Sequence, residues 1–329
     1  MRSRLILAAL SVLAASPTFA ASHDFEPPFV MPKPPMVEPD APLAPTPGGP
    51  RPDLAFGAYQ RGYFITALRE ALKRVGADPG DAAAMTLIGE IYRDGIAVRQ
   101  NMVEAEHWFQ LASKAGDPAA AFELGVILLD GAPGIARDRK GAEAQFAKAA
   151  VAGHATALYN LGVLAIDVEN GAKPDFVKAA SYFKRAAEAG DGNAAYSYGV
   201  QLRDGKGVPL DIGESAHWLK VASDEGIIAG QVEYAIMLFN GVGVTRDEAA
   251  AARIFLLAAA RRNPIAANRL AHLYVSGRGV PKDLVLAALW NGMAKAAGLD
   301  DEKLDKAIGQ LSPDDQAKVN KLTQLELEF

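Results

Sequence analysis

The stretch Asn193–Trp218 reads NAAYSYGVQLRDGKGVPLDIGESAHW, and it specifies a pair of short antiparallel helices. A small residue, Gly199, lies in the middle of the first helix and lets a neighbouring helix approach closely. Gly205 and Gly207 follow, where this helix must end in a left-handed conformation. Asp211 then suits the N-cap of a second helix. The stretch therefore predicts two helices joined by a tight, glycine-bearing turn.

Two further expectations concern the second helix of this stretch. Glu214 follows Asp211 by three residues, and Glu104 follows Asn101 in the same way, which predicts a capping box at both places. Together with Leu202, Trp218 is expected to fill the gap between the two helices. Truncating it to alanine should then cost on the order of 3 to 5 kcal/mol, because the lost ring would leave a cavity.

The same pattern recurs about every 36 residues along the chain. The small residue of the first helix falls at Gly89, Gly125, Gly162, Gly199, Ala235 and Ala271, with intervals of 36, 37, 37, 36 and 36. The residue that opens the second helix falls at Asn101, Asp138, Asp175, Asp211, Asp247 and Asp283, with intervals of 37, 37, 36, 36 and 36. Two unrelated landmarks that keep step in this way mark a stacked repeat protein, in which neighbouring units bury each other's apolar faces.

The predicted fold class is therefore all-α: an α/α superhelical solenoid of six regular helix-pair repeats, with an irregular N-terminal repeat and C-terminal capping helices. We assign the six repeats to residues 81–299. Residues 53–80 carry apolar side chains at helical spacing and form the N-terminal cap or degenerate repeat. Residues 300–329 form the capping helices, and Ser312-Pro313 marks the start of the last one. An extended surface is a better expectation for such a chain than a catalytic pocket.

The first 20 residues predict a secretory signal peptide. Arg2 and Arg4 provide the positive start, Leu5–Ala15 is apolar, and a small-x-small site ends at Ala20. The apolar stretch is shorter than the ~20 residues that cross a bilayer. We therefore expect an exported protein whose mature chain begins at Ala21 and has no transmembrane segment, located in the periplasm of a Gram-negative bacterium.

Residues 21–52 are predicted to be a disordered, proline-rich linker. Eleven prolines fall between residues 27 and 52, a density that excludes helix and strand. A spacer that holds the repeats away from the envelope is favoured over a docking strip for a partner, since proline-rich linkers commonly act only as spacers.

The composition of the chain limits the classes of molecule that it is expected to bind. The formal net charge of the 329 residues is −5, and it becomes −7 once Arg2 and Arg4 leave with the signal peptide. An acidic chain disfavours nucleic acid and anionic membranes as main partners. The sequence has no cysteine, so no disulfide stabilises the fold in an oxidising compartment, and helix packing must suffice.

The repeat unit resembles the SEL-one-like repeat, a relative of the tetratricopeptide repeat with longer turns that carry glycine. The resemblance rests on turns such as Gly241-Val-Gly-Val-Thr-Arg-Asp247 and Gly277-Arg-Gly-Val-Pro-Lys-Asp283, followed by Ala-x-x-Trp and a closing Ala-x-x-Gly. The third unit has only one glycine in 167–175, and a remodelled loop is expected there. The resemblance implies a superhelical adaptor of envelope, export or signalling assemblies. Secreted members that look like cell-wall or β-lactam-directed enzymes are cysteine-rich, unlike this chain.

Similarity to the tetratricopeptide fold also implies which residues line the inner groove. They lie two before and two after the leucine of the Leu-Gly pair, and three residues further on. Carried over by that alignment, the predicted groove residues are Phe122, Val126, Leu129, Tyr159, Val163, Ile166, Tyr196, Val200, Arg203, Val232, Ile236 and Phe239. The ends of the groove turn polar, with Thr86, Glu90 and Arg93 in the first unit and Asn268 and His272 in the sixth.

Other motifs give no strong indication of chemistry. The five histidines are scattered, and no zinc-binding signature occurs, so no metal and no cofactor is predicted. Ser197 in Ala195-Tyr-Ser-Tyr-Gly199 matches a nucleophile elbow in letters alone, because an elbow follows a strand and Ser197 falls in a predicted helix. No catalytic residue is assigned.

These observations predict a non-enzymatic scaffold that recruits or regulates another periplasmic or membrane-anchored envelope protein. An apolar strip with a polar rim usually binds protein. Whether the groove is open or is covered by superhelical twist or the proline-rich arm stays open at this point. Two alternatives also remain: a cell-wall or β-lactam-directed hydrolase, and a sensory module for a small envelope ligand.

Overall fold

The computed structural model describes residues 53–167 and 173–327, with side chains up to residue 324. Within these residues the protein is all-α, with sixteen helices and no strand. The helices are α1 (Leu54–Gln60), α2 (Phe64–Ala77), α3 (Ala82–Asp94), α4 (Met102–Lys114), α5 (Pro118–Asp130), α6 (Arg139–Val151), α7 (Ala155–Ile166), α8 (Phe176–Glu188), α9 (Gly192–Asp204), α10 (Ile212–Asp224), α11 (Ile228–Asn240), α12 (Glu248–Ala260), α13 (Pro264–Ser276), α14 (Leu284–Ala296), α15 (Glu302–Ile308) and α16 (Pro313–Leu327). The predicted signal peptide 1–20 and linker 21–52 lie outside the described residues, as do residues 168–172 of the third repeat's loop.

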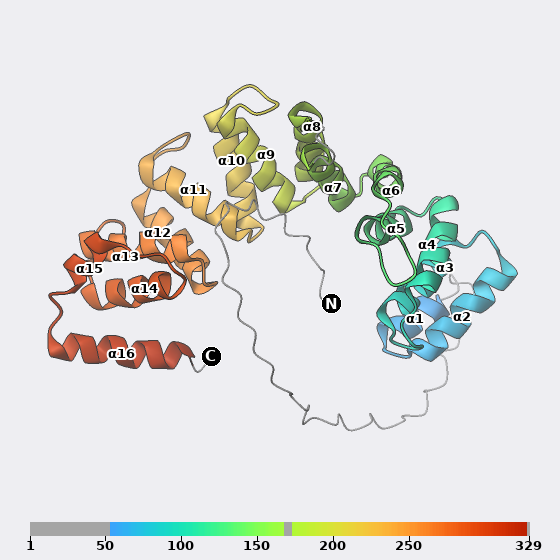
Figure 1. Cartoon of the computed structure of the whole chain (residues 1–329), viewed down its shortest axis with the longest axis horizontal. Helices are drawn as coiled ribbons and strands as arrows, with labels where there is room; N and C mark the ends of the chain where they lie inside the picture. The colour runs from blue at the N-terminus through green and yellow to red at the C-terminus, as the bar shows by residue number, and fades with distance from the viewer. Residues whose placement is uncertain (1–52, 168–172, 328–329) are drawn as a thin grey trace, which may run out of the picture.

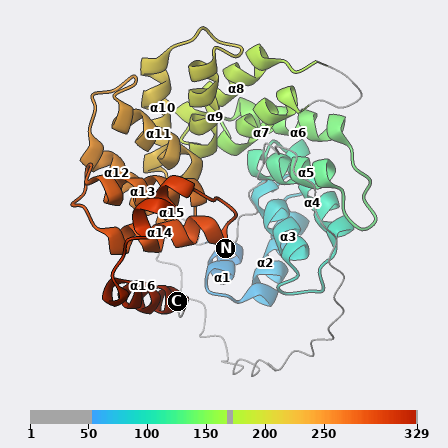
Figure 2. The same ribbon diagram turned by 60° about the vertical axis from the view of Figure 1, so that its left-hand side comes forward.

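The helices form an arch in which each pair packs on the pairs next to it (Figure 1). The pairs from α3–α4 to α13–α14 correspond to the six predicted repeats. α1 and α2 precede them as an additional pair, and α15 and α16 follow, packed on α13 and α14. Figure 2 shows α7, α9 and α11 nearer the inside of the arch and α8, α10 and α12 nearer its outside. The predicted solenoid is confirmed.

The six predicted caps of the second helices all accept a backbone hydrogen bond from their own helix. Each cap's own N–H, in turn, donates to a carbonyl near the end of the first helix. Asp211 N–H, for example, donates to the Leu202 oxygen at 3.0 Å, and Asp247 N–H to the Leu238 oxygen at 2.9 Å. This bond fixes how far the second helix starts from the end of the first, and it recurs in all six units.

The predicted capping boxes are therefore only half formed. Asp211 Oδ1 accepts from Glu214 N–H at 2.8 Å, and Asn101 Oδ1 accepts from Glu104 N–H at 3.2 Å. The reverse bond from the glutamate is not made, because the N–H of each cap is already bound to the first helix. Glu214 instead accepts a long 3.4 Å hydrogen bond from Trp218 Nε1.

The small residues of the first helices pack against a large side chain of the second helix. A Cβ built at Gly89, Gly125 or Gly162 would lie 2.5 to 2.7 Å from the ring of Phe109, Phe146 or Phe183, and each of these rings is buried. In the fourth unit Leu219 takes this place beneath Gly199. Trp218, one residue earlier, is only half-buried. Leu202 is buried as expected, and Trp218 packs edge-on against Tyr198 of the first helix, so it fills the gap only in part. Successive helical residues point about 100° apart, and Leu219 is the one aimed at Gly199.

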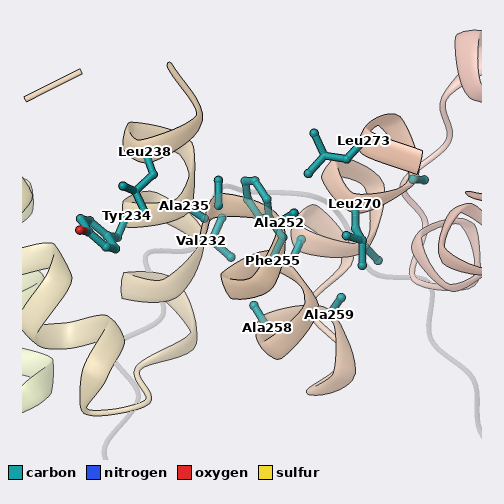
Figure 3. Close-up of a cluster of buried hydrophobic side chains, with 14 of the residues drawn as sticks. Val232, Tyr234, Ala235, Leu238, Ala252, Phe255, Ala258, Ala259, Leu270 and Leu273 are labelled. Carbon is teal, nitrogen blue, oxygen red and sulfur yellow. The ribbon is translucent and has the colours of Figure 1, made fainter. Parts of the chain in front are cut away.

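The core runs along the solenoid as overlapping clusters and not as one centre. Figure 3 shows one of them, where Phe255 of α12 lies among side chains of α11 and α13. Leu270 and Val232 belong to the same cluster, and each comes from a different repeat. Burial that is shared between neighbours explains why one helix pair could not hide its apolar face alone.

Candidate functional site

The inner surface of the arch is the candidate site, and it is built from the first helices of successive repeats. Eleven of the twelve predicted groove residues are half-buried, whereas Val232 is buried, with 5 % of its surface exposed. These residues come from α5, α7, α9 and α11, so the structure places them on the first helices of four consecutive repeats. Val232 belongs to the core more than to an open surface. That these residues bind a partner stays a prediction.

Aromatic rings of this surface are held in place by rings behind them. Phe122 stacks on His154 with centroids 4.5 Å apart, and it also contacts Phe146 at 5.9 Å. Tyr159 lies against Phe183 at 5.7 Å. Burial raises the pKa of the Tyr159 hydroxyl, so this group stays neutral at ordinary pH. The surface thus presents fixed, uncharged aromatic edges, which suit apolar contact with a partner.

Ion pairs close two of the junctions between first helices. Arg93 Nη1 lies 2.6 Å from Glu123 Oε2 between α3 and α5, and Arg203 Nη1 lies 2.9 Å from Glu233 Oε2 between α9 and α11. Burial raises the pKa of Glu90, which lies near the first of these pairs. The predicted groove residue Arg203 therefore has an intramolecular partner.

The polar end predicted in the sixth repeat serves mainly to hold the next helix. Asn268 Nδ2 donates to Asp301 Oδ2 at 3.1 Å, and His272 Nε2 lies 2.8 Å from the same oxygen. Asp301 is the N-cap of α15, and these hydrogen bonds from Asn268 and His272 help to lower its pKa. Asn268 and His272 thus dock α15 against α13.

Two sets of polar residues in the first helices were not singled out from the sequence. One set is the N-caps of the first helices, which include Asp117, His154 and Asp191. The other is the position two residues before the small residue of the first helix, occupied by Glu123 in the second repeat and Glu233 in the fifth. The polar N-caps recur at the repeat period in five of the six repeats, with Ile227 in the fifth, so the aligned repeats carried a signal for them. Glu123 and Glu233 share one repeat position in only two repeats, which is a weaker signal.

Residues with possible chemistry do not gather into a reactive centre. Ser197 lies in the middle of α9 and donates to the Asn193 carbonyl at 2.9 Å, as an ordinary helical serine does. Over the residues that the structure describes, no cluster of three or more histidine or acidic side chains could hold a metal ion. None of the described helices is long and apolar enough to cross a membrane.

Comparison with known families explains this geometry. A profile of the Sel1 repeat matches six consecutive segments, at residues 82–117, 118–154, 155–191, 192–227, 228–263 and 264–299. The chain belongs to the Sel1 repeat family. Each matched segment begins at the first residue of a first helix, from α3 to α13. Sel1 repeats generally mediate protein–protein interaction, and the family is typically non-enzymatic.

Solved structures with Sel1 repeats have the same fold. One is c5321, a protective antigen present in uropathogenic Escherichia coli strains that displays an SLR fold, with a TM-score of 0.69 and 24% identity over 83% of this chain and 61% of that chain. Another is a Sel1 repeat protein from Oxalobacter formigenes, with a TM-score of 0.62 and 25% identity over 77% of this chain and 99% of that one. The present chain thus spans about three-fifths of the length of the E. coli structure. No curated protein matches the sequence.

Proposed function

We propose that this Sel1 repeat protein is an exported, periplasmic scaffold that holds another envelope protein along the inside of its arch. The observation that carries the proposal is the continuous row of half-buried aromatic and aliphatic side chains on α5, α7, α9 and α11. Such a row offers a partner apolar area without requiring the scaffold to unfold or rearrange. Its rim carries charged residues, among them Glu123, Arg203 and Glu233, as expected for a protein-binding surface.

The shape of the surface suits an amphipathic helix or an extended peptide. Successive first helices present the same three positions, so a long ligand would meet a similar set of side chains at each repeat. Recognition of this kind uses anchors at regular spacing along the ligand. The partner is a periplasmic protein or the periplasmic part of a membrane-anchored one, and the proposed scaffold recruits or regulates it without catalysis of its own.

Position-specific photocrosslinking in the source cell tests the groove with little disturbance of the fold. A photoreactive phenylalanine analogue replaces Tyr159 or Tyr196 on the inner surface. In matched control chains it replaces Val177 or Leu257, which are 69% and 58% exposed on α8 and α12. The inner positions should yield one defined adduct, identified by mass spectrometry, and the outer positions should not. Adducts formed only from Val177 and Leu257 would place the partner on the outer surface and contradict the proposal.

Export is tested separately through the mature N-terminus. Removal of residues 1–20 should give a chain that begins at Ala21 and is recovered in the periplasmic fraction, and intact-mass measurement reads this directly. An uncleaved chain found in the cytoplasm would contradict the periplasmic location. The proposal that the groove binds a partner would still be decided by the crosslinking test.

A further inference from the structure

The junction between α11 and α13 differs from two others on the inner surface. At the α3–α5 and α9–α11 junctions an arginine near the end of one first helix pairs with a glutamate of the next: Arg93 with Glu123, and Arg203 with Glu233. The residues at the same two repeat positions of the α11–α13 junction are Phe239 and Arg269. Here the arginine, Arg269, lies on the later helix, where the other two junctions have a glutamate. The earlier helix carries Phe239 in place of a charged residue, so no carboxylate faces Arg269 from that position.

Arg269 consequently lacks the carboxylate partner that the arginines of the other two junctions have. Its side chain is exposed, and it takes part in none of the hydrogen bonds or ion pairs found among the described residues. Asp301 and Glu248, which contact His272 and Arg278, already have these basic partners. Glu248 also binds Arg246.

A small pocket opens beside Arg269. Its volume is about 120 Å³, and its walls combine apolar side chains with two basic ones. The lining residues are Ile236, Phe239, Asn240, Phe255, Arg269, His272 and Leu273. The Arg278 guanidinium lies 4.2 Å from the centroid of the Phe239 ring and helps to hold it in place. The pocket therefore has apolar walls with the unpaired Arg269 guanidinium at its edge.

We infer that this pocket binds an acidic side chain of the partner, with an apolar neighbour of that residue resting on Phe239. At the two equivalent junctions this protein already places a carboxylate opposite an arginine, so the spacing of the helices suits that pair. An arginine fork also matches a carboxylate in two parallel hydrogen bonds. The inference rests on the proposed scaffold function, and it adds the chemistry that the partner must present at the sixth repeat.

Peptides selected from a random twelve-residue display library provide the probe. The mature full chain, the Arg269→Glu variant and an Arg253→Glu control are used as separate baits. Arg253 is exposed on α12, outside the pocket, and its substitution changes the net charge by the same amount. The wild-type chain and the control should enrich an Asp or Glu beside an aliphatic or aromatic residue. Arg269→Glu should lose that preference and favour Lys or Arg there.

One selected peptide is then synthesised with its acidic residue intact or replaced by the matching amide. Binding to the wild-type chain should weaken about tenfold with the amide, as for loss of a partly exposed charge-assisted hydrogen bond. Binding to Arg269→Glu should not distinguish the two peptides. Circular dichroism checks that both variants stay folded.

The outcomes separate this inference from the proposed function. Peptides that bind without an acidic preference, and that Tyr196→Ala weakens, would overturn the carboxylate site and leave the groove standing. Peptides that neither Tyr196→Ala nor Arg269→Glu weakens, or failure to enrich any sequence, would contradict both.

Discussion

At the scale of single residues, the repeat unit depends on which of two adjacent apolar side chains faces the small residue of the first helix. Phe183 lies under Gly162 and is 1% exposed, and Leu219 lies under Gly199 and is fully buried. Trp218 lies beside this contact and meets Tyr198 edge-on at 5.8 Å. The sequence located the pair of helices. Trp218 and Leu219 point about 100° apart around the second helix, so the orientation of that helix decides which of the two side chains becomes core.

Truncations of these two rings should therefore have different effects. Phe183→Ala should lower the free energy of unfolding by about 3 to 5 kcal/mol, because it leaves a cavity between two helices. Trp218→Ala should cost roughly 1 to 2 kcal/mol, since part of this ring already meets water. Urea unfolding followed by circular dichroism measures both. An equal loss in the two variants would mean that Trp218 is as much a core residue as Phe183.

His154 makes stability depend on pH. Its Nδ1 accepts the Ala157 N–H at 3.3 Å at the start of α7, and burial lowers its pKa. The folded chain therefore binds a proton less readily than the unfolded chain, so this residue's contribution is fully present above the usual histidine pKa of about 6.5. It is lost as the pH falls below that value and through the lowered pKa of the folded chain. A protonated ring also loses the acceptor and places a positive charge at a helix N-terminus.

His154→Asn should reduce the loss of stability between pH 7 and pH 5. Asparagine keeps an acceptor that does not titrate, and Asn263 caps α13 in this way with a bond of 2.9 Å from Ala266 N–H. Urea unfolding of the wild type and the variant at both pH values measures the difference. An unchanged pH dependence in His154→Asn would show that other groups cause it.

At the scale of elements, the turns within the repeats also hold neighbouring repeats together. The second glycine of the turn, at Gly207, Gly243 or Gly279, has a positive φ of 71 to 76°. A Cβ there would overlap the carbonyl oxygen of the first residue in the preceding repeat's second helix, which for Gly279 is Glu248. Glycine is needed both for the left-handed backbone and for this close approach.

Alanine at Gly279 should consequently be more harmful than alanine at Gly298. Gly298 also has a positive φ, of 83°, but nothing lies within 4 Å of an added Cβ. Gly298→Ala should cost about 1 to 2 kcal/mol for the left-handed conformation. Gly279→Ala should cost a further 1 to 3 kcal/mol or so, because α12 and the turn must move apart. Equal thermal unfolding midpoints would show that the turn does not press on α12.

At the scale of the whole molecule, contacts run mainly between neighbouring elements, so stability should be local. α16 packs on α14 and buries Val319. A chain that ends at Leu311 should expose that face of α14 and lose protection from hydrogen exchange in α13 and α14. Exchange in α3 to α8 should stay as in the intact chain, as measured by mass spectrometry. Loss of protection along the whole arch would mean that it unfolds as one unit.

The sequence by itself determined the fold class, the number of repeats, the caps and the turn glycines, because these depend on local backbone preferences that recur every 36 or 37 residues. It also placed the predicted groove residues on the inner helices, through the resemblance to related repeats. Only the tertiary structure decided that Val232 is core, that Leu219 and not Trp218 meets Gly199, and that Arg269 faces no carboxylate. These outcomes depend on how one repeat is rotated against the next, and a rotation between packed helices is set by side chains from both repeats at once.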